Sequence, residues 1–165
     1  HGLYCVEFCR KYPDLKATVL DWAVGLENAK ITLTQEKDVA NRIDLFEADF
    51  EKENLPQEKF DFMFLGNIIH GLNEAGNKAL FKKIADATVS NGVIAILDQY
   101  ANVKGSLFVK GVASMIGWNL FAFAGGRAYD FGVVKQWLED AGFHSVTLTH
   151  LRQAPGFSFK KKKKK

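Results

Sequence analysis

Short apolar runs alternate with segments of helical periodicity along most of this chain. The runs at 61–66 and 93–98 are almost entirely apolar, and 17–21 and 43–48 are further β-prone stretches. Strands that are covered on both faces lose the alternation of polar and apolar residues that a half-exposed strand shows. Such strands, when separated by helices, are typical of a parallel sheet with crossover helices.

Between these runs, apolar residues recur every three or four positions, which predicts helices. The predicted helices cover residues 2–12, 24–37, 74–89 and 130–141. Asn73 suits the N-cap of the third helix, and Gly142 ends the fourth. Residues 145–151 and 156–159 are predicted to form a final pair of strands in a hairpin. The expected fold class is α/β, with a mostly parallel sheet and an antiparallel strand pair at its C-terminal end.

Acidic and polar residues follow the carboxyl ends of the predicted strands, where doubly wound sheets bind ligands. Asp21 ends the first strand, and its carboxylate offers two oxygens to the hydroxyls of a ribose. Asp49 can accept a hydrogen bond from an adenine amino group, with Phe50 stacked on the ring. Either acid alone would equally suit a helix N-cap or a solvated loop. Their placement after successive strands favours a nucleoside site.

Six segments carry a pattern that extends over almost the whole chain. They are His1-Gly2-Leu3-Tyr4 with Tyr12 to Trp22, Asn41-Arg42-Ile43 leading to Ala48-Asp49-Phe50, Asp61 with Asn67-Ile68-Ile69-His70, Asn91-Gly92 leading to Asp98, Gly125-Gly126-Arg127-Ala128-Tyr129, and Ala141-Gly142-Phe143. In this order they resemble the small-molecule O-methyltransferases of the caffeate and polyketide-tailoring type. That resemblance implies a Rossmann-like class I methyltransferase sheet and S-adenosylmethionine as the cofactor.

The resemblance also implies which residues bind the cofactor. They are Gly2, Asp21, Trp22, Asp49, Phe50 and Asn67. Gly2 matches the last glycine of the cofactor loop, and Asp21 matches the acid that binds the ribose. Asp49 and Phe50 match the adenine pair, and Asn67 would lie near the methionine moiety.

His70 is the expected general base. A hydroxyl acceptor is a poor nucleophile until its proton is removed, and a histidine with a pKa of about 6.5 is largely neutral at pH 7. The resemblance places Asp98 as one of two acids that orient this histidine, while the second position falls at Ala128, which cannot orient it. The pair His70-Gly71 also departs from the family's usual pattern. A histidine that only caps the strand–helix junction is the alternative.

The segment 99–129 is rich in aromatic residues and is expected to form the lid of the acceptor pocket. The residues proposed to contact the acceptor are Met115, Trp118 and Phe121. A pocket of this kind favours an aromatic or polyketide-like acceptor over a charged one. The same aromatic stripe would equally suit a protein core. The apolar stretch at 107–124 has polar interruptions and is shorter than the ~20 residues that span a bilayer, so no membrane association is expected.

Charge and cysteine content narrow the function further. Lys and Arg number 22 against 19 Asp and Glu, but six of the lysines form the run 160–165, so the remaining body is mildly acidic. The run is expected to be a tag or a placeholder outside a catalytic domain at 1–159, and no nucleic-acid partner is expected. Cys5 and Cys9 have no metal-site spacing. We expect them to be reduced packing residues of a cytoplasmic protein with no metal.

The resemblance begins within the cofactor loop, so the strand that precedes this loop in the family has no counterpart here. That strand would lie between those at 17–21 and 61–66. The sequence therefore predicts a fragment of a chain about twice as long, which would be inactive alone and a homodimer at full length.

Two other functions fit part of the pattern. A nicotinamide-dependent oxidoreductase would explain Asp21, but not Asp49, Phe50 or His70. A non-catalytic binding protein with a methyltransferase fold would explain Ala128.

Overall fold

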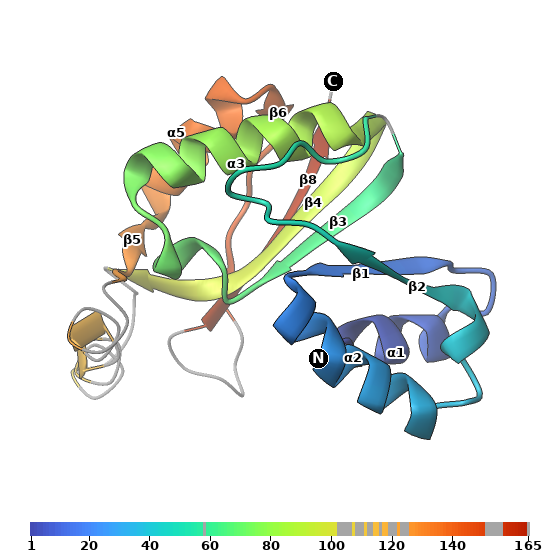
Figure 1. Ribbon diagram of the computed structural model, residues 1–165. Coiled ribbons are helices and arrows are strands. Elements are labelled where there is room, and N and C mark those ends of the chain that lie inside the picture. Colours follow the sequence, from blue (N-terminus) through green and yellow to red (C-terminus); the bar gives the residue numbers. More distant parts are fainter. Residues whose placement is uncertain are drawn as a thin grey trace. The chain divides into compact units, whose positions relative to one another are not determined.

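The structure is a computed structural model, and it divides the chain into two compact units, His1–Asn54 and Leu55–Lys165 (Figure 1). It describes residues 1–57, 59–101, 107, 111, 114–115, 117–118, 122, 126–150 and 157–164. Each unit has its own sheet, and the two units are described in turn.

The first unit contains two helices and two strands. In chain order its elements are α1 (Leu3–Lys11), β1 (Ala17–Asp21), α2 (Ala23–Gln35), the 3₁₀ turn η1 (Ala40–Arg42) and β2 (Ile43–Glu47). Strands β1 and β2 are parallel and in register from Ala17 opposite Ile43 to Asp21 opposite Glu47. Their carboxyl ends therefore meet at one edge.

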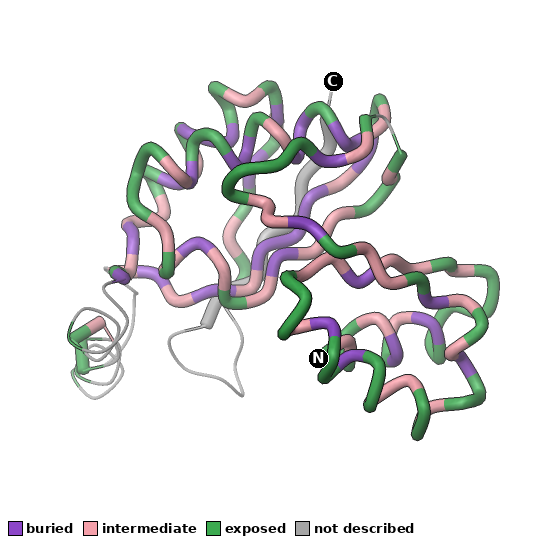
Figure 2. Tube along the Cα trace, viewed as in Figure 1, coloured by how far each residue is buried: buried purple, intermediate pink, exposed green. Residues whose placement is uncertain are grey.

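Both helices of this unit lie on one side of the strand pair (Figure 1). The inward residues of these elements form one core, and Figure 2 marks the buried positions along the backbone. The core residues are Val6, Cys9, Val19, Leu26, Ala29, Val39 and Ile43. Cys5 and Cys9 are both free thiols, and the side chain of Cys9 is fully buried. The expectation that they are packing residues is thus confirmed.

The second unit is built around a longer sheet. In chain order its elements are β3 (Phe60–Gly66), η2 (Ile69–Gly71), α3 (Glu74–Ala87), β4 (Thr88–Ala101), β5 (Tyr129–Asp130), α5 (Phe131–Asp140), β6 (Phe143–His144), β7 (Thr149–His150) and β8 (Phe157–Lys164). The strand order is β3-β4-β8-β6, with β5 on β4 and β7 on β8. Strands β3 and β5 run parallel to β4, and β8 runs antiparallel to it. The fold-class prediction of a mostly parallel sheet with antiparallel C-terminal strands is confirmed.

Two predicted strands differ clearly from the structure, each for a local reason. Strand β4 begins at Thr88 rather than 93, because its pairing with β3 continues past an irregularity between Thr88 and Val93, where Asn91 has φ 62°. Of the predicted strand 145–151, Thr149–His150 is a strand, β7, and it pairs antiparallel with β8, as the predicted hairpin requires. The predicted start at 145 is wrong, because Ser145 has φ 59°, which interrupts an extended backbone.

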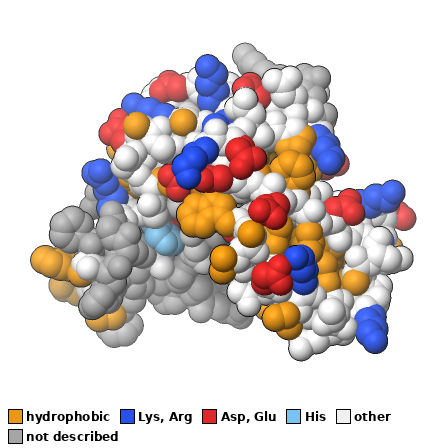
Figure 3. Space-filling model, in the orientation of Figure 1, with side chains coloured by type: hydrophobic (Ala, Val, Ile, Leu, Met, Phe, Trp, Pro, Cys, Tyr) orange, Lys and Arg blue, Asp and Glu red, His pale blue; other side chains and the backbone are white. Residues whose placement is uncertain are grey.

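The backbone of the lysine run takes part in the sheet, since β8 extends from Phe157 to Lys164 and pairs with β4. The domain limit at 159 and the origin of the run stay predictions. Elsewhere, Figure 3 shows acidic and basic side chains interspersed over the viewed face.

Within the described part of the chain, β1 pairs only with β2, and β3 pairs with β4 alone. Each strand thus has one edge without a strand partner there. No helix in that part of the chain is long and apolar enough to cross a bilayer. The same residues include no group of three His, Cys, Asp or Glu side chains that could hold a metal ion.

Candidate active site

The first group of predicted site residues lies where β1 and β2 end. Asp21 is the last residue of β1, and its main-chain oxygen accepts a 3.2 Å hydrogen bond from the N–H of Ala48 beyond β2. One carboxylate oxygen, Oδ1, accepts from the N–H of Trp22 at 2.8 Å. A carboxylate has about four acceptor positions, so Asp21 retains capacity for a diol.

Gly25, in the first turn of α2, shapes the surroundings of Asp21. A Cβ placed on Gly25 would overlap all three terminal atoms of the Asp21 carboxyl group. The glycine therefore gives the carboxylate its position against the helix. The sequence analysis missed this residue, although a glycine in the first turn of a helix, where alanine is more favourable, was a usable signal.

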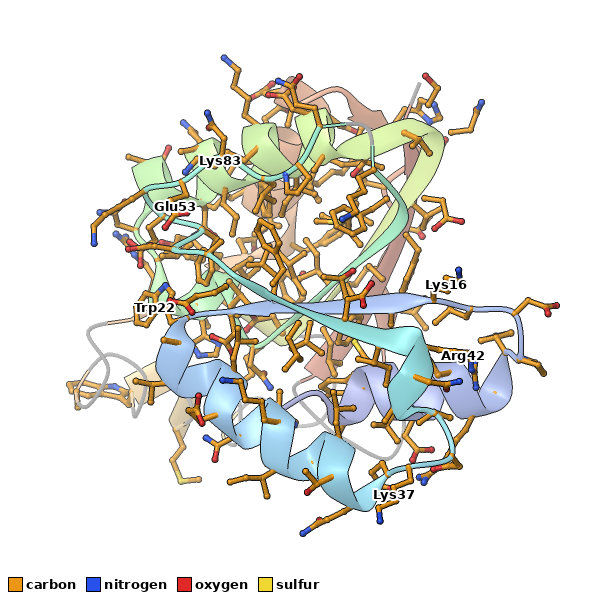
Figure 4. All side chains as sticks on the ribbon, turned by 45° about the vertical axis from the view of Figure 1, so that its right-hand side comes forward. Lys16, Trp22, Lys37, Arg42, Glu53 and Lys83 are labelled. Carbon is orange, nitrogen blue, oxygen red and sulfur yellow. The ribbon has the colours of Figure 1, made fainter. Side chains whose placement is uncertain are left out.

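Trp22 and Phe50 form an aromatic surface beside Asp21. Their rings are stacked, with centroids 6.1 Å apart and planes 16° from parallel. Trp22 lies where β1 passes into α2 (Figure 4) and is 49% exposed. The strand register brings the two rings together, because Trp22 follows β1 and Phe50 follows the neighbouring end of β2.

Asp49 is engaged within its own loop. Its Oδ2 pairs with the ammonium of Lys52 at 2.8 Å, and its Oδ1 accepts from the N–H of Glu51 at 3.1 Å. The hydrogen bond from Lys52 is the main reason why the pKa of Asp49 lies below its ordinary value. These contacts are those of a loop acid, so an adenine would have to bind to its remaining acceptor positions.

Gly2 precedes α1 in the left-handed backbone region, at φ 75°. A Cβ there would approach Val19 of β1 and Ala29 of α2 at 3.5 and 3.6 Å. The positive φ, rather than lack of space, is therefore what favours glycine at this position.

The second group of site residues consists of His70 and the buried acid Asp98. Nδ1 of His70 lies 2.7 Å from Oδ1 of Asp98, whose side chain is fully buried. The N–H groups of Ile69 and Gln99 also donate to this carboxylate, at 3.0 and 2.7 Å. Asp98 was expected at a strand end, but β4 continues to Ala101, so Asp98 lies inside the strand. It is placed to orient His70 rather than to meet solvent.

This hydrogen bond fixes the protonation pattern of His70. A carboxylate can only accept, so Nδ1 carries the hydrogen and Nε2 is the basic nitrogen. The bond to Asp98 raises the pKa of His70 above its ordinary value, and partial burial of the ring opposes that rise. The side chain remains 17% exposed.

Asn67 and the segment around Ala128 both make backbone contacts near the site. Asn67 follows the end of β3 and has φ 57°. Its N–H donates to the carbonyl oxygen of Leu97 at 2.9 Å. Asparagine tolerates this conformation better than most residues, so the backbone alone accounts for it. Next to Ala128, the N–H of Arg127 donates to the His70 carbonyl at 2.8 Å. The segment leading into β5 thus supports the His70 turn through its main chain.

The expected acceptor residues are only partly described. The side chains of Met115 and Trp118 are 60% and 72% exposed. Phe121 lies outside the described residues. Their role stays a prediction.

Each unit therefore assembles one part of the predicted site. Asp21, Trp22 and Phe50 are brought together in the first unit, and His70 and Asp98 in the second. An acid and stacked rings at strand ends, and a histidine after β3 paired with an aspartate inside β4, are the arrangement expected of a Rossmann-like methyltransferase. The sequence matches the O-methyltransferase domain family over residues 1–144, so the chain belongs to that family.

Individual relatives agree with the family. The chain is 29% identical over 147 residues to 3-hydroxy-5-methyl-1-naphthoate 3-O-methyltransferase of Streptomyces sahachiroi, a match that covers 88% of this chain and 41% of the relative. A crystal structure of a putative O-methyltransferase from Nostoc punctiforme PCC 73102 shares the fold with TM-score 0.85 and 23% identity, covering 99% and 48% of the two chains. Human N-acetylserotonin methyltransferase, solved with S-adenosylmethionine, shares the fold with TM-score 0.74 and 20% identity. That match covers 99% of this chain and 44% of the human chain.

The chain thus spans less than half the length of these relatives, in line with the predicted fragment. The family prediction is confirmed, and with it S-adenosylmethionine as the cofactor of this class.

Proposed function

We propose that this chain is part of an enzyme that transfers a methyl group from S-adenosylmethionine to a hydroxyl of a small aromatic or polyketide-like molecule. The observation that carries the proposal is the pairing of His70 with the fully buried Asp98. The naphthoate named for the Streptomyces relative supports an acceptor of this chemical class.

The residues at the ends of β1 and β2 fit the adenosyl group. Asp21 has carboxylate acceptor positions left for the ribose hydroxyls, and the stacked rings of Trp22 and Phe50 offer an apolar surface for the adenine. Asp49 would receive the adenine amino group, and Gly2 and Asn67 would border the rest of the cofactor. When bound, the cofactor supplies an electrophilic methyl group on a sulfonium.

His70 and Asp98 supply the proton chemistry. Nε2 of His70 would take the proton of the acceptor hydroxyl, so that its oxygen could accept the methyl group that the bound cofactor would supply, with the cofactor's sulfide as the leaving group. Asp98 holds the Nδ1 hydrogen and stabilises the imidazolium that forms. The remainder of the rate comes from positioning the two reactants in line.

The proposal is tested on the full-length protein with two variants. Asp21→Ala should weaken the binding of S-adenosylhomocysteine in calorimetry by about tenfold or more, because it removes charged acceptors of the ribose hydroxyls. His70→Gln should bind the same ligand normally, yet lose at least about a hundredfold in methyl transfer to hydroxynaphthoates.

Other outcomes separate the alternatives. Tight binding with no methylated product from any hydroxyarene would favour a non-catalytic binding protein. Binding of a nicotinamide dinucleotide in place of S-adenosylhomocysteine would favour an oxidoreductase.

We further propose that the full-length protein is a cytoplasmic homodimer that binds neither nucleic acid nor membranes. The free thiols support the location, the mildly acidic body of the sequence argues against nucleic-acid binding, and the family resemblance supports the dimer. Size-exclusion chromatography with light scattering tests the dimer directly.

A further inference from the structure

The backbone turn that carries His70, residues 68–73, is held by a buried asparagine on α3. Nδ2 of Asn77 donates to the carbonyl oxygens of Ile69 at 2.9 Å, Leu72 at 3.2 Å and Asn73 at 3.2 Å. The Asn77 side chain is fully buried. These acceptors lie on both sides of His70, so one side chain fixes the whole turn.

Burying an amide is costly, which makes this position informative. Among the described residues, Oδ1 of Asn77 has no hydrogen-bond partner. A buried polar atom without a partner costs about 1–3 kcal/mol, so an apolar residue would be the cheaper way to fill this space. The contacts of Nδ2 with the turn are the compensating interaction.

A second element holds the same turn from the strand side. The hydroxyl of Tyr129 in β5 donates to the Leu72 carbonyl at 2.6 Å, and the N–H of Arg127 donates to the His70 carbonyl at 2.8 Å. A Cβ on Gly126 would overlap that His70 carbonyl, so the close approach requires glycine. Neither contact touches the imidazole itself.

We propose that Asn77, assisted by the hydroxyl of Tyr129, is a positioning residue that holds the His70 turn so that Nδ1 meets Asp98 and Nε2 is presented to the methyl acceptor. This inference rests on the proposed function and deepens it. Among the described residues, Asp98 is the charged group that interacts with the His70 imidazole. The Arg127 guanidinium lies over the Tyr129 ring instead, 5.3 Å from its centroid.

The consequence of losing Asn77 can be followed through His70. Without Nδ2 the carbonyls of Ile69 and Leu72 lose their partner, and the turn relaxes toward other donors. The 2.7 Å contact between Nδ1 and Asp98 then lengthens. Because that contact holds the pKa of His70 above its ordinary value, the pKa falls toward about 6.5.

The test is an NMR titration of the His70 ring in full-length protein without ligand. Asn77→Ala should lower the pKa of His70 by about half a pH unit or more, and Tyr129→Phe should lower it less. Thr88→Val is the matched control. Thr88 is also fully buried and donates to Ile84 at 2.6 Å at the far end of α3, about 16 Å along the helix from Asn77. It should lose stability and leave the pKa of His70 unchanged.

The outcomes separate this inference from the proposed function. An unchanged His70 pKa in a folded Asn77→Ala protein that still binds S-adenosylhomocysteine overturns the positioning role alone. If Asn77→Ala does not fold, an unchanged pKa in Tyr129→Phe overturns it. Failure of the wild-type protein to bind S-adenosylhomocysteine overturns the proposed function, whatever the titration shows.

Discussion

The Asp98 carboxylate accepts hydrogen bonds from His70 and from two backbone N–H groups, and this arrangement links histidine ionisation to stability. The pKa of His70 is raised in the folded protein. The pair therefore stabilises the fold fully below the ordinary histidine pKa of about 6.5, and this contribution is lost as the pH rises through the folded-state pKa.

We accordingly expect Asp98→Asn to destabilise the protein more at pH 5.5 than at pH 8.5. Urea unfolding of wild type and variant at both pH values measures the two differences. In a His70→Gln background the pH dependence of the Asp98→Asn effect should disappear. Equal destabilisation at both pH values with His70 present would contradict the assigned pair.

Gly25 gives a second prediction for single residues. Gly25→Ala improves helix propensity by up to about 1 kcal/mol, so the free energy of unfolding should stay level or rise. The added methyl displaces the Asp21 carboxylate, so affinity for S-adenosylhomocysteine should fall by about tenfold.

Thermal unfolding and calorimetry on the full-length protein separate these two effects. In an Asp21→Ala background, Gly25→Ala should cause no further loss of affinity. A loss of the same size in both backgrounds would show that Gly25 acts without Asp21.

Among the elements of the first unit, Arg42 connects η1 to the end of α1 (Figure 4). Its guanidinium donates to the carbonyls of Cys9 at 2.8 Å and of Tyr12 and Leu15 at 3.1 Å. These include one of the last carbonyls of α1, which has no partner within the helix. A planar guanidinium can serve several acceptors at once, whereas an ammonium is a point charge.

Arg42→Ala should therefore lower the free energy of unfolding by about 2 kcal/mol, and Arg42→Lys should recover only part of it. Arg10 is the control, because its ion pairs with Glu7, Glu36 and Asp38 are exposed. Arg10→Ala should cost clearly less, because solvent screens exposed ion pairs. Urea unfolding compares the three variants, and equal losses for Arg42→Ala and Arg10→Ala would contradict this role of Arg42.

For the whole molecule, strand pairing predicts a gradient of amide protection. Strand β4 is paired on both sides, by β3 and β8, and Ile94, Ala95 and Ile96 are fully buried. Strand β1 is paired with β2 alone among the described residues. Hydrogen exchange of this 165-residue chain should be slowest in β4 and faster in β1.

The longer protein should change this gradient. If it supplies the strand predicted between 17–21 and 61–66, the outer-edge amides of β1 and β3 become protected, while those of β4 change little. Equal exchange of β1 and β3 in the two chains would contradict the predicted strand.

The sequence alone determined the order and type of most elements and the class of protein. Apolar periodicity located β1 within its exact observed limits and most helices within two residues of their ends, because burial of one face is a local property of the chain. The pattern of strand-end residues likewise pointed to a nucleoside and to His70. The positive φ of Ser145 was not predicted, because the pattern of apolar residues carries no information about a single backbone angle.

Only the tertiary structure decided how those residues are supported. Asp98 and His70 are 28 positions apart, Tyr129 and Leu72 are 57 apart, and their hydrogen bonds arise from sheet register and helix packing. The sequence did not show what Gly25 and Asn77 contact, which are the Asp21 carboxylate and the His70 turn. Contacts between residues far apart in the sequence depend on the whole fold, whereas the chemical properties of a side chain follow from its residue type alone.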